Sequence, residues 1–430
     1  MTSQKSRMAS ILSLPLHLVA DVLRLLDGIH QLPPILFSHR IFYSALLDTP
    51  SLPLDILRTQ IPKNLFFLAI ATHRSQKSVG DSSGMGVQGF RKKCCTDSPD
   101  DIGGNQLIIP VGNALQIAHI HDVVLQLRDE FTLRSLRKLH GLSKDDCIPY
   151  DQELSLGESY RVARAFYRFQ IYTNLFAESQ EDPDLFAWYE SDGEETTDEA
   201  EEDIPSPLKD QKYLFFDQHQ PCVNEQLACV YNFLETRITG AMLTISSVAP
   251  TFVNDIHGGG NLTEWLDERS QLFEEQRCLS IGLPRLTRLL KSKTLEEWQS
   301  CLDESGNVGR SCLEEDIQEF NQRKRPSENR GIWRMEDMEQ LARDVGADSD
   351  ADVDNVSDDH PRKMWTKVYF DQTHGRFRLG DHVCTSMKFI YELRSVGYVM
   401  WDEARMQKDV CKVNLSKAYR GIRLVCGIYC

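Results

Sequence analysis

The sequence lacks three features that would place it in a common class of protein. Its most apolar run after the N-terminal region, residues 65–71, is far shorter than the ~20 residues of a membrane-spanning helix. It has no excess of positive charge: 64 acidic residues outnumber 48 lysines and arginines, and the formal net charge of −16 at pH 7 argues against nucleic-acid binding as the main role. The 12 cysteines form no Cys-x-x-Cys pair, and there is no secretory signal. We therefore expect a protein of the cytoplasm or nucleus, with reduced cysteines and with neither membrane nor nucleic acid as a partner.

The sequence also lacks the short motifs of common enzymes. It has no His-Glu-x-x-His helix, P-loop, Gly-x-Ser-x-Gly turn or kinase signature. Residues 84–89 match the dinucleotide-binding pattern Gly-x-Gly-x-x-Gly, but that motif needs a strand before it and a helix after it. The flanking residues suit neither element, so we interpret this segment as a glycine-rich loop. We expect a non-catalytic protein with no catalytic residue, no cofactor and no metal ligand.

What the sequence does contain is helical periodicity interrupted by acidic segments. The pattern predicts a mainly α protein, in which an N-terminal helical module precedes an irregular multi-helix body with disordered acidic linkers. The expected parts are a helical module with bracing helices (10–72), a flexible linker (73–106), a helical region (107–177), an acidic linker (178–212), a second helical region (213–343), a second acidic linker (344–360) and a C-terminal helical segment (361–430).

The N-terminal module is strongly apolar. We expect Ser13 to cap a helix that ends at Gly28, because apolar residues recur between them at spacings of three and four. A short apolar turn is predicted over residues 32–37, and a second helix over residues 41–46. The start of the chain is therefore predicted to be a small helical cluster.

This cluster resembles an F-box, the helical module that docks a substrate receptor onto the Skp-type adaptor of cullin-RING (SCF) ubiquitin ligases. The resemblance rests on Leu14-Pro15, on the apolar residues of the first helix and on residues 38–42. It implies that the chain binds a Skp-type adaptor protein and, through it, a cullin, while the body recruits an unknown protein substrate. The residues that would form the core of the module or contact the adaptor are Leu14, Pro15, Leu18, Val22, Leu25, Leu26, Ile35, Leu36, Ile41 and Phe42.

Three later segments extend the resemblance. Residues 158–169, 224–230 and 397–402, in that order and spacing, look like a group of filamentous-fungal F-box-like proteins with large helical C-terminal regions. That resemblance covers most of the chain. It implies the docking step and leaves the substrate open.

A basic stripe lies in the first of these segments. We expect Ser159 to cap a helix whose residues Arg161, Arg164 and Arg168 share one side. Our interpretation is a solvated face that balances acidic neighbours. The alternative is that the stripe receives an acidic segment.

Two other functions remain open beside the adaptor. In the first alternative the chain is a helical scaffold that keeps the F-box-like cluster as core and binds no adaptor. In the second, residues 107–343 contain an unrecognised enzyme. Exposure of the apolar residues distinguishes adaptor from scaffold, because a docking surface leaves several of them on the outside. A deep pocket with converging polar groups and perturbed pKa values would favour the enzyme.

Overall fold

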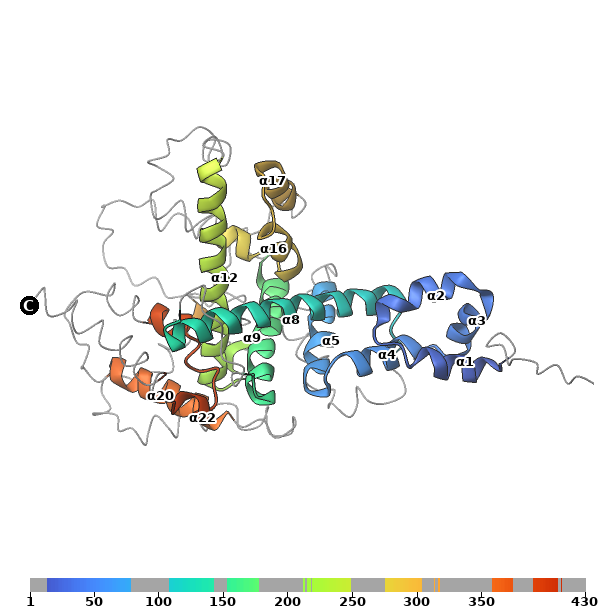
Figure 1. The fold of residues 1–430 in the computed structure, drawn as a ribbon, viewed down its shortest axis with the longest axis horizontal. Coiled ribbons are helices and arrows are strands. Elements are labelled where there is room, and N and C mark those ends of the chain that lie inside the picture. The colour runs from blue at the N-terminus through green and yellow to red at the C-terminus, as the bar shows by residue number, and fades with distance from the viewer. Residues whose placement is uncertain are drawn as a thin grey trace, which may run out of the picture. The chain divides into compact units, whose positions relative to one another are not determined.

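The computed structural model describes residues 14–78, 108–142, 153–177, 219–248, 275–303, 358–373 and 390–408, together with residues 212, 215–217, 313, 316–317 and 411. Within these ranges the regular structure is helical and no strand occurs (Figure 1). The predicted mainly α fold is therefore confirmed. The predicted linkers fall almost wholly outside the described residues, as does the glycine-rich segment 84–89.

The chain divides into two compact units. Unit 1 comprises Met1–Arg74 with Arg91–Asp122, and unit 2 comprises Ser75–Phe90 with Val123–Cys430. The helices α5 and α8 each begin in unit 1 and end in unit 2.

Unit 1 is a cluster of short helices. They are α1 (Leu16–Leu23), the 3₁₀ helix η2 (Ile29–Gln31), α2 (Leu32–Ser38), α3 (Arg40–Asp48), α4 (Leu52–Gln60) and the first part of α5 (Lys63–Ser78), to which the first part of α8 (Val111–His140) is added. The helix α1 packs against α3 and α4, and α2 packs against α3. The sharp breaks have local causes: His39 is extended, with φ −161°, and its Nδ1 accepts a hydrogen bond from the Ile41 N–H (3.2 Å). Pro62 separates α4 from α5.

Two boundaries predicted for unit 1 are wrong. The first helix ends at Leu23, ahead of the predicted Gly28, although the Leu25 N–H still reaches the Val22 carbonyl in a tighter turn (3.1 Å). Residues 32–37, predicted as a turn, belong to helix α2. Its two prolines lie at the start of the helix, where a missing N–H costs nothing. The second predicted helix is confirmed by α3, whereas the predicted cap Ser13 lies outside the described residues.

Unit 2 contains the longer helices. They are the remainder of α8, α9 (Leu156–Phe176), α12 (Pro221–Val248), α16 (Leu283–Leu289), α17 (Leu295–Asp303), α20 (Asp359–Thr373) and α22 (Glu403–Met406). The pair α9 and α12 packs together, and α20 packs against α12. A capping box begins α9, in which the Ser155 hydroxyl accepts from the Glu158 N–H and the Glu158 carboxylate accepts from the Ser155 N–H. The predicted cap Ser159 is therefore wrong by one turn.

An aromatic cluster forms part of the core of unit 2. Phe131 of α8 contacts Phe166 of α9 and Phe233 of α12 edge to face, and its ring centroid lies 6.3 Å from that of Trp401. Gly397 approaches the same cluster with φ +64°, a conformation that glycine adopts without strain.

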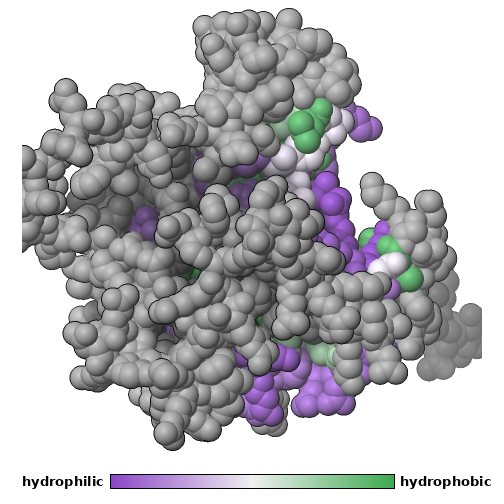
Figure 2. All heavy atoms as spheres, turned by 90° about the vertical axis from the view of Figure 1, so that its left-hand side faces the viewer, coloured by the Kyte–Doolittle hydropathy of each residue, from purple (hydrophilic) through white to green (hydrophobic). Residues whose placement is uncertain are grey.

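On the face of the molecule shown in Figure 2, the described residues are mainly hydrophilic, with small separate hydrophobic areas.

Candidate functional site

One side of α1 exposes a row of large apolar side chains. Leu18 and Val22 are 40% and 42% exposed, and Leu25, just after the helix, is 80% exposed. Their spacings of four and three place them on the same side of a helix. We call Leu18, Val22 and Leu25 the α1 stripe. A row of this kind on a small unit is typical of a surface that meets a partner.

The opposite side of α1 is used by the fold of unit 1. Val19, Ala20 and Leu23 are buried. Arg24 holds α1 against α4, since its Nε donates to the Asp55 carboxylate of α4 (3.0 Å). This hydrogen bond raises the pKa of Arg24. The helix therefore carries apolar residues on a buried side and on an exposed side.

None of the ten predicted adaptor residues is buried. The structure leaves Pro15, Leu18, Val22 and Leu25 exposed and Leu14, Leu26, Ile35, Leu36, Ile41 and Phe42 half-buried. The helices that carry them, α1, α2 and α3, are brought together by the packing of α1 and α2 on α3. Buried positions such as Leu32 and Ala45 supply the core instead.

Sequence reasoning missed three exposed side chains of the same module. Phe37 at the end of α2 is 90% exposed, and Tyr43 and Leu47 are exposed on α3. The spacing of four between Tyr43 and Leu47 is a signal that the sequence carries. No pattern marks Phe37, because its exposure depends on where α2 ends.

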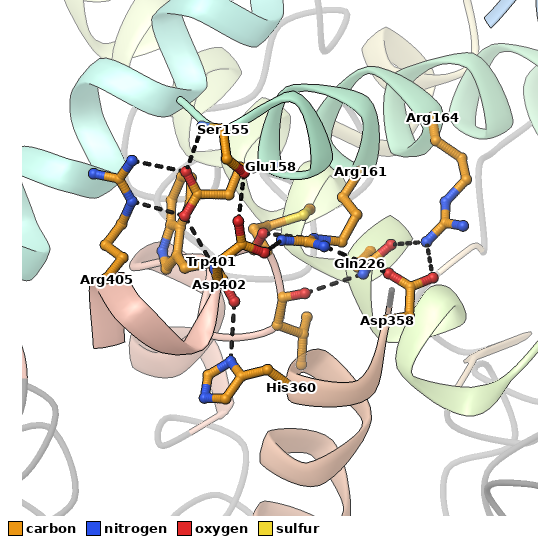
Figure 3. Close-up of polar contacts among 12 residues, drawn as sticks. Ser155, Glu158, Arg161, Arg164, Gln226, Asp358, His360, Trp401, Asp402 and Arg405 are labelled. Carbon is orange, nitrogen blue, oxygen red and sulfur yellow. Dashed lines mark hydrogen bonds and ion pairs between the residues drawn. The ribbon is translucent and has the colours of Figure 1, made fainter. Parts of the chain in front are cut away.

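Unit 2 contains a second candidate, a network of buried charged side chains around α9 (Figure 3). We call it the polar core. At its centre the buried Glu158 carboxylate accepts from Arg405 Nε (2.8 Å) and Nη2 (2.7 Å), and from the backbone N–H of Asp402 (3.0 Å). The same carboxylate completes the capping box with Ser155. One side chain thus ties the start of α9 to residues 402–405.

The next two arginines of α9 continue the polar core. Arg161 Nε donates to the Met400 carbonyl (2.8 Å), and its guanidinium pairs with Asp402. Burial raises the pKa of Asp402, but hydrogen bonds from Ser155 and Arg161 outweigh it and lower the pKa overall. One turn further along, Arg164 Nη2 donates to the Asp358 carboxylate (2.8 Å).

The third arginine pairs with neutral groups. Arg168 donates to the Val223 carbonyl (2.8 Å) and to the Asn224 side-chain oxygen (2.7 Å), both at the start of α12. The guanidinium also lies over the ring of Phe215, 5.3 Å from its centroid.

The predicted solvated face on α9 is therefore wrong. Arg161, Arg164 and Arg168 are 1%, 4% and 1% exposed, and such burial is tolerated because each guanidinium is hydrogen-bonded. The alternative, that the stripe receives an acidic segment, is met at one residue: Asp358, near the end of the predicted linker 344–360, accepts a hydrogen bond from Arg164, and residues 344–357 lie outside the described residues.

A fully buried ion pair joins α12 to the C-terminal part of unit 2. Arg394 Nε and Nη2 donate to the two carboxylate oxygens of Glu225 (2.8 and 3.2 Å). Beside it, the Gln226 amide donates to the Val399 carbonyl (3.0 Å). The three segments 158–169, 224–230 and 397–402, far apart in sequence, thus share one polar core.

The polar core links α9, α12 and the described residues 394–405 through ion pairs and hydrogen bonds. Five cysteines of the described residues, Cys222, Cys229, Cys278, Cys301 and Cys411, are buried. Burial raises the pKa of the Cys229 thiol well above its ordinary value and also raises that of Cys411, so both thiols are protonated and poor nucleophiles at neutral pH. Among the described residues, no group of three or more His, Cys, Asp and Glu side chains is arranged to hold a metal ion.

In the part of the chain that the structure describes, none of the helices combines the length and apolar character needed to cross a membrane. Comparisons of the chain with protein-family models, with curated proteins and with solved structures give no match.

Proposed function

We propose that this protein is a non-catalytic substrate-receptor adaptor. Unit 1 docks a Skp-type subunit of a cullin-RING (SCF) ubiquitin ligase, and unit 2 recruits a protein substrate. The chemistry is then supplied by other subunits, and this chain contributes proximity. The choice of a Skp-type adaptor as the partner rests on the resemblance of the sequence to fungal F-box-like proteins.

The α1 stripe is the observation that carries this proposal. Leu18, Val22 and Leu25 are apolar and exposed on a helix whose other side already fills the core. These three side chains form one apolar row on the outside of unit 1, which is the kind of surface that a partner covers. A partner that covers α1 and the exposed aromatic residues of α2 and α3 buries them, and specific interfaces bury ~1,200–2,000 Å² in total.

The polar core supports the second half of the proposal. Its ion pairs and hydrogen bonds fix α9, α12 and the C-terminal segment with many directional contacts. A receptor body needs such rigidity, because a substrate must be held in one orientation toward the transferring enzyme.

The alternative scaffold makes a different prediction for the α1 stripe. A scaffold that retains the cluster as core would bury these side chains. Leu25, at 80% exposure, does not favour that alternative.

Co-purification tests the proposal. The full chain is expressed with the Skp-type adaptor of its own organism, beside the double variant Leu18→Asp/Val22→Asp. A matched control is Leu156→Asp, which adds a charge at an exposed leucine of unit 2, in the first turn of α9 where an acid is favourable. Circular dichroism establishes that all three proteins fold.

The expected result is co-purification with the wild type and with Leu156→Asp, and loss of the adaptor with the double variant. If the wild type folds but no adaptor co-purifies with it, the docking proposal is overturned. Retention by the double variant would show that the α1 stripe is not the contact.

A further inference from the structure

The carboxylate of Asp358 lies against two arginines of one helix (Figure 3). Arg164 Nη2 donates to Asp358 Oδ2 (2.8 Å), and Arg161 Nη1 lies 3.9 Å from Oδ1. The arginine side chains are 1% and 5% exposed and that of Asp358 is 13% exposed, so the acid occupies the outer position. We call Arg161 and Arg164 the arginine pair.

The fit of this carboxylate is incomplete. Asp358 Oδ1 is buried and accepts no hydrogen bond within the described part of the chain. The contact to Arg161 is too long to serve as one. A buried acceptor without a donor carries a free-energy cost, so Asp358 is held less firmly than the fully bonded Glu158.

The sequence before Asp358 is acidic. Between residues 344 and 358, acids occupy positions 344, 348, 350, 352, 354 and 358, and the segment has no lysine or arginine. Asp358 is thus the last acid of a series, and within this series it is the acid that the structure describes. Asp358 directly precedes α20, and its carbonyl accepts from the Arg362 N–H of that helix (2.9 Å), so displacement of Asp358 is expected to disturb the first turn of α20.

We propose that the arginine pair is a binding site for an acidic peptide segment of a partner, and that Asp358 is its intramolecular occupant. An acid of the partner replaces Asp358 on Arg161 and Arg164, whose guanidinium groups bind carboxylate and phosphate alike. The chain then binds acidic partners weakly at rest, because its own carboxylate competes at a very high effective concentration. This inference concerns unit 2 alone and needs no Skp-type protein.

Fluorescence anisotropy on the full chain tests this competition. The probe is a fluorescein-labelled peptide that copies residues 350–358, and a second arm uses the same peptide phosphorylated at the serine of position 357. The proteins are the wild type, Asp358→Asn, and Asp358→Asn/Arg164→Gln. Asp359→Asn is the matched control, since it neutralises the neighbouring acid, whose exposed carboxylate pairs with Arg362 (2.6 Å).

Removal of the competing carboxylate is expected to tighten probe binding by about tenfold or more in Asp358→Asn. Asp359→Asn is expected to bind like the wild type, and the variant that also lacks Arg164 is expected to lose the gain. The phosphorylated arm reports whether the pair prefers phosphate to carboxylate. Equal affinity of the wild type and a folded Asp358→Asn for both probes would overturn the proposal.

A measurement on the wild type covers the case in which Asp358→Asn does not fold. Hydrogen exchange of residues 358–366 is followed with and without saturating probe. Faster exchange in the first turn of α20 is expected if the probe displaces Asp358. Unchanged exchange, at a probe concentration that saturates binding, would overturn the proposal.

Discussion

Replacement of Arg394 by Met tests the energetics of the polar core. The Glu225 carboxylate and the Arg394 guanidinium are 2% and 3% exposed, so water cannot solvate either charge if its partner is removed. Arg394→Met removes the two hydrogen bonds to Glu225 and leaves a buried carboxylate unpaired, which costs ~3–5 kcal/mol. The change keeps most of the apolar volume of the side chain, so the loss reports charge rather than packing.

The double variant separates the charge effect from the loss of contacts. Glu225→Leu/Arg394→Met removes both charges at once and leaves no unpaired group from this pair. We therefore expect the double variant to be less destabilised than Arg394→Met alone, with a coupling energy of ~2 kcal/mol or more between the two positions.

Local stability is the quantity to measure, because a chain with two units need not unfold in one step. Hydrogen exchange of α12 and of residues 390–402 gives the free energy of local opening in the wild type, in the single variants Arg394→Met and Glu225→Leu, and in the double variant. Two results would refute the reasoning: a cost of Arg394→Met below ~1 kcal/mol, or a double variant whose cost equals the sum of the single variants.

Three further predictions follow from single residues. Leu23→Ala removes a buried leucine of α1 and should cost ~2–5 kcal/mol in the exchange of unit 1, whereas Leu25→Ala on the exposed side should change it by less than ~0.5 kcal/mol. Burial, with the charges of two neighbouring arginines, lowers the pKa of His219 well below its ordinary value. As pH falls through the ordinary pKa of histidine, this side chain is protonated in the unfolded chain and stays neutral in the folded chain, so folding loses free energy. In urea titrations at about pH 7.5 and about pH 5.5, the wild type should therefore lose ~1 kcal/mol more stability than His219→Gln. Gly397 has φ +64°, and the methyl group of Gly397→Ala would lie 3.1 Å from Phe131 Cζ. The thermal midpoint of this variant should therefore fall, by the equivalent of ~1–3 kcal/mol of stability.

The sequence predicted those elements whose pattern is local. The apolar spacing around Ala45 gave α3, and the long periodic region gave α8 and α9. Helix α2 was missed because its two adjacent prolines resemble a turn, although proline is tolerated in a first helical turn. The Ser-x-x-Glu pattern at Ser155 and Glu158 was present in the sequence as a capping box, and it was the signal that would have corrected the predicted cap.

The polar core could not be predicted from the sequence for a different reason. Arg161 and its partner Asp402 are 241 positions apart, and Arg394 and its partner Glu225 are 169 apart. A buried arginine and a surface arginine look the same in a helical pattern until the partner is known. The exposure of Leu25 was likewise undecided, since an apolar residue at helical spacing fits both a core and a docking face.

Titration calorimetry between the full chain and the Skp-type adaptor of its own organism tests the central claim most directly. The account predicts saturable binding with a negative heat-capacity change, because apolar surface leaves water at the α1 stripe. It also predicts that Leu18→Asp/Val22→Asp abolishes the binding while Leu156→Asp leaves it intact. A folded wild type that binds no adaptor, or a double variant that binds as tightly as the wild type, would contradict it.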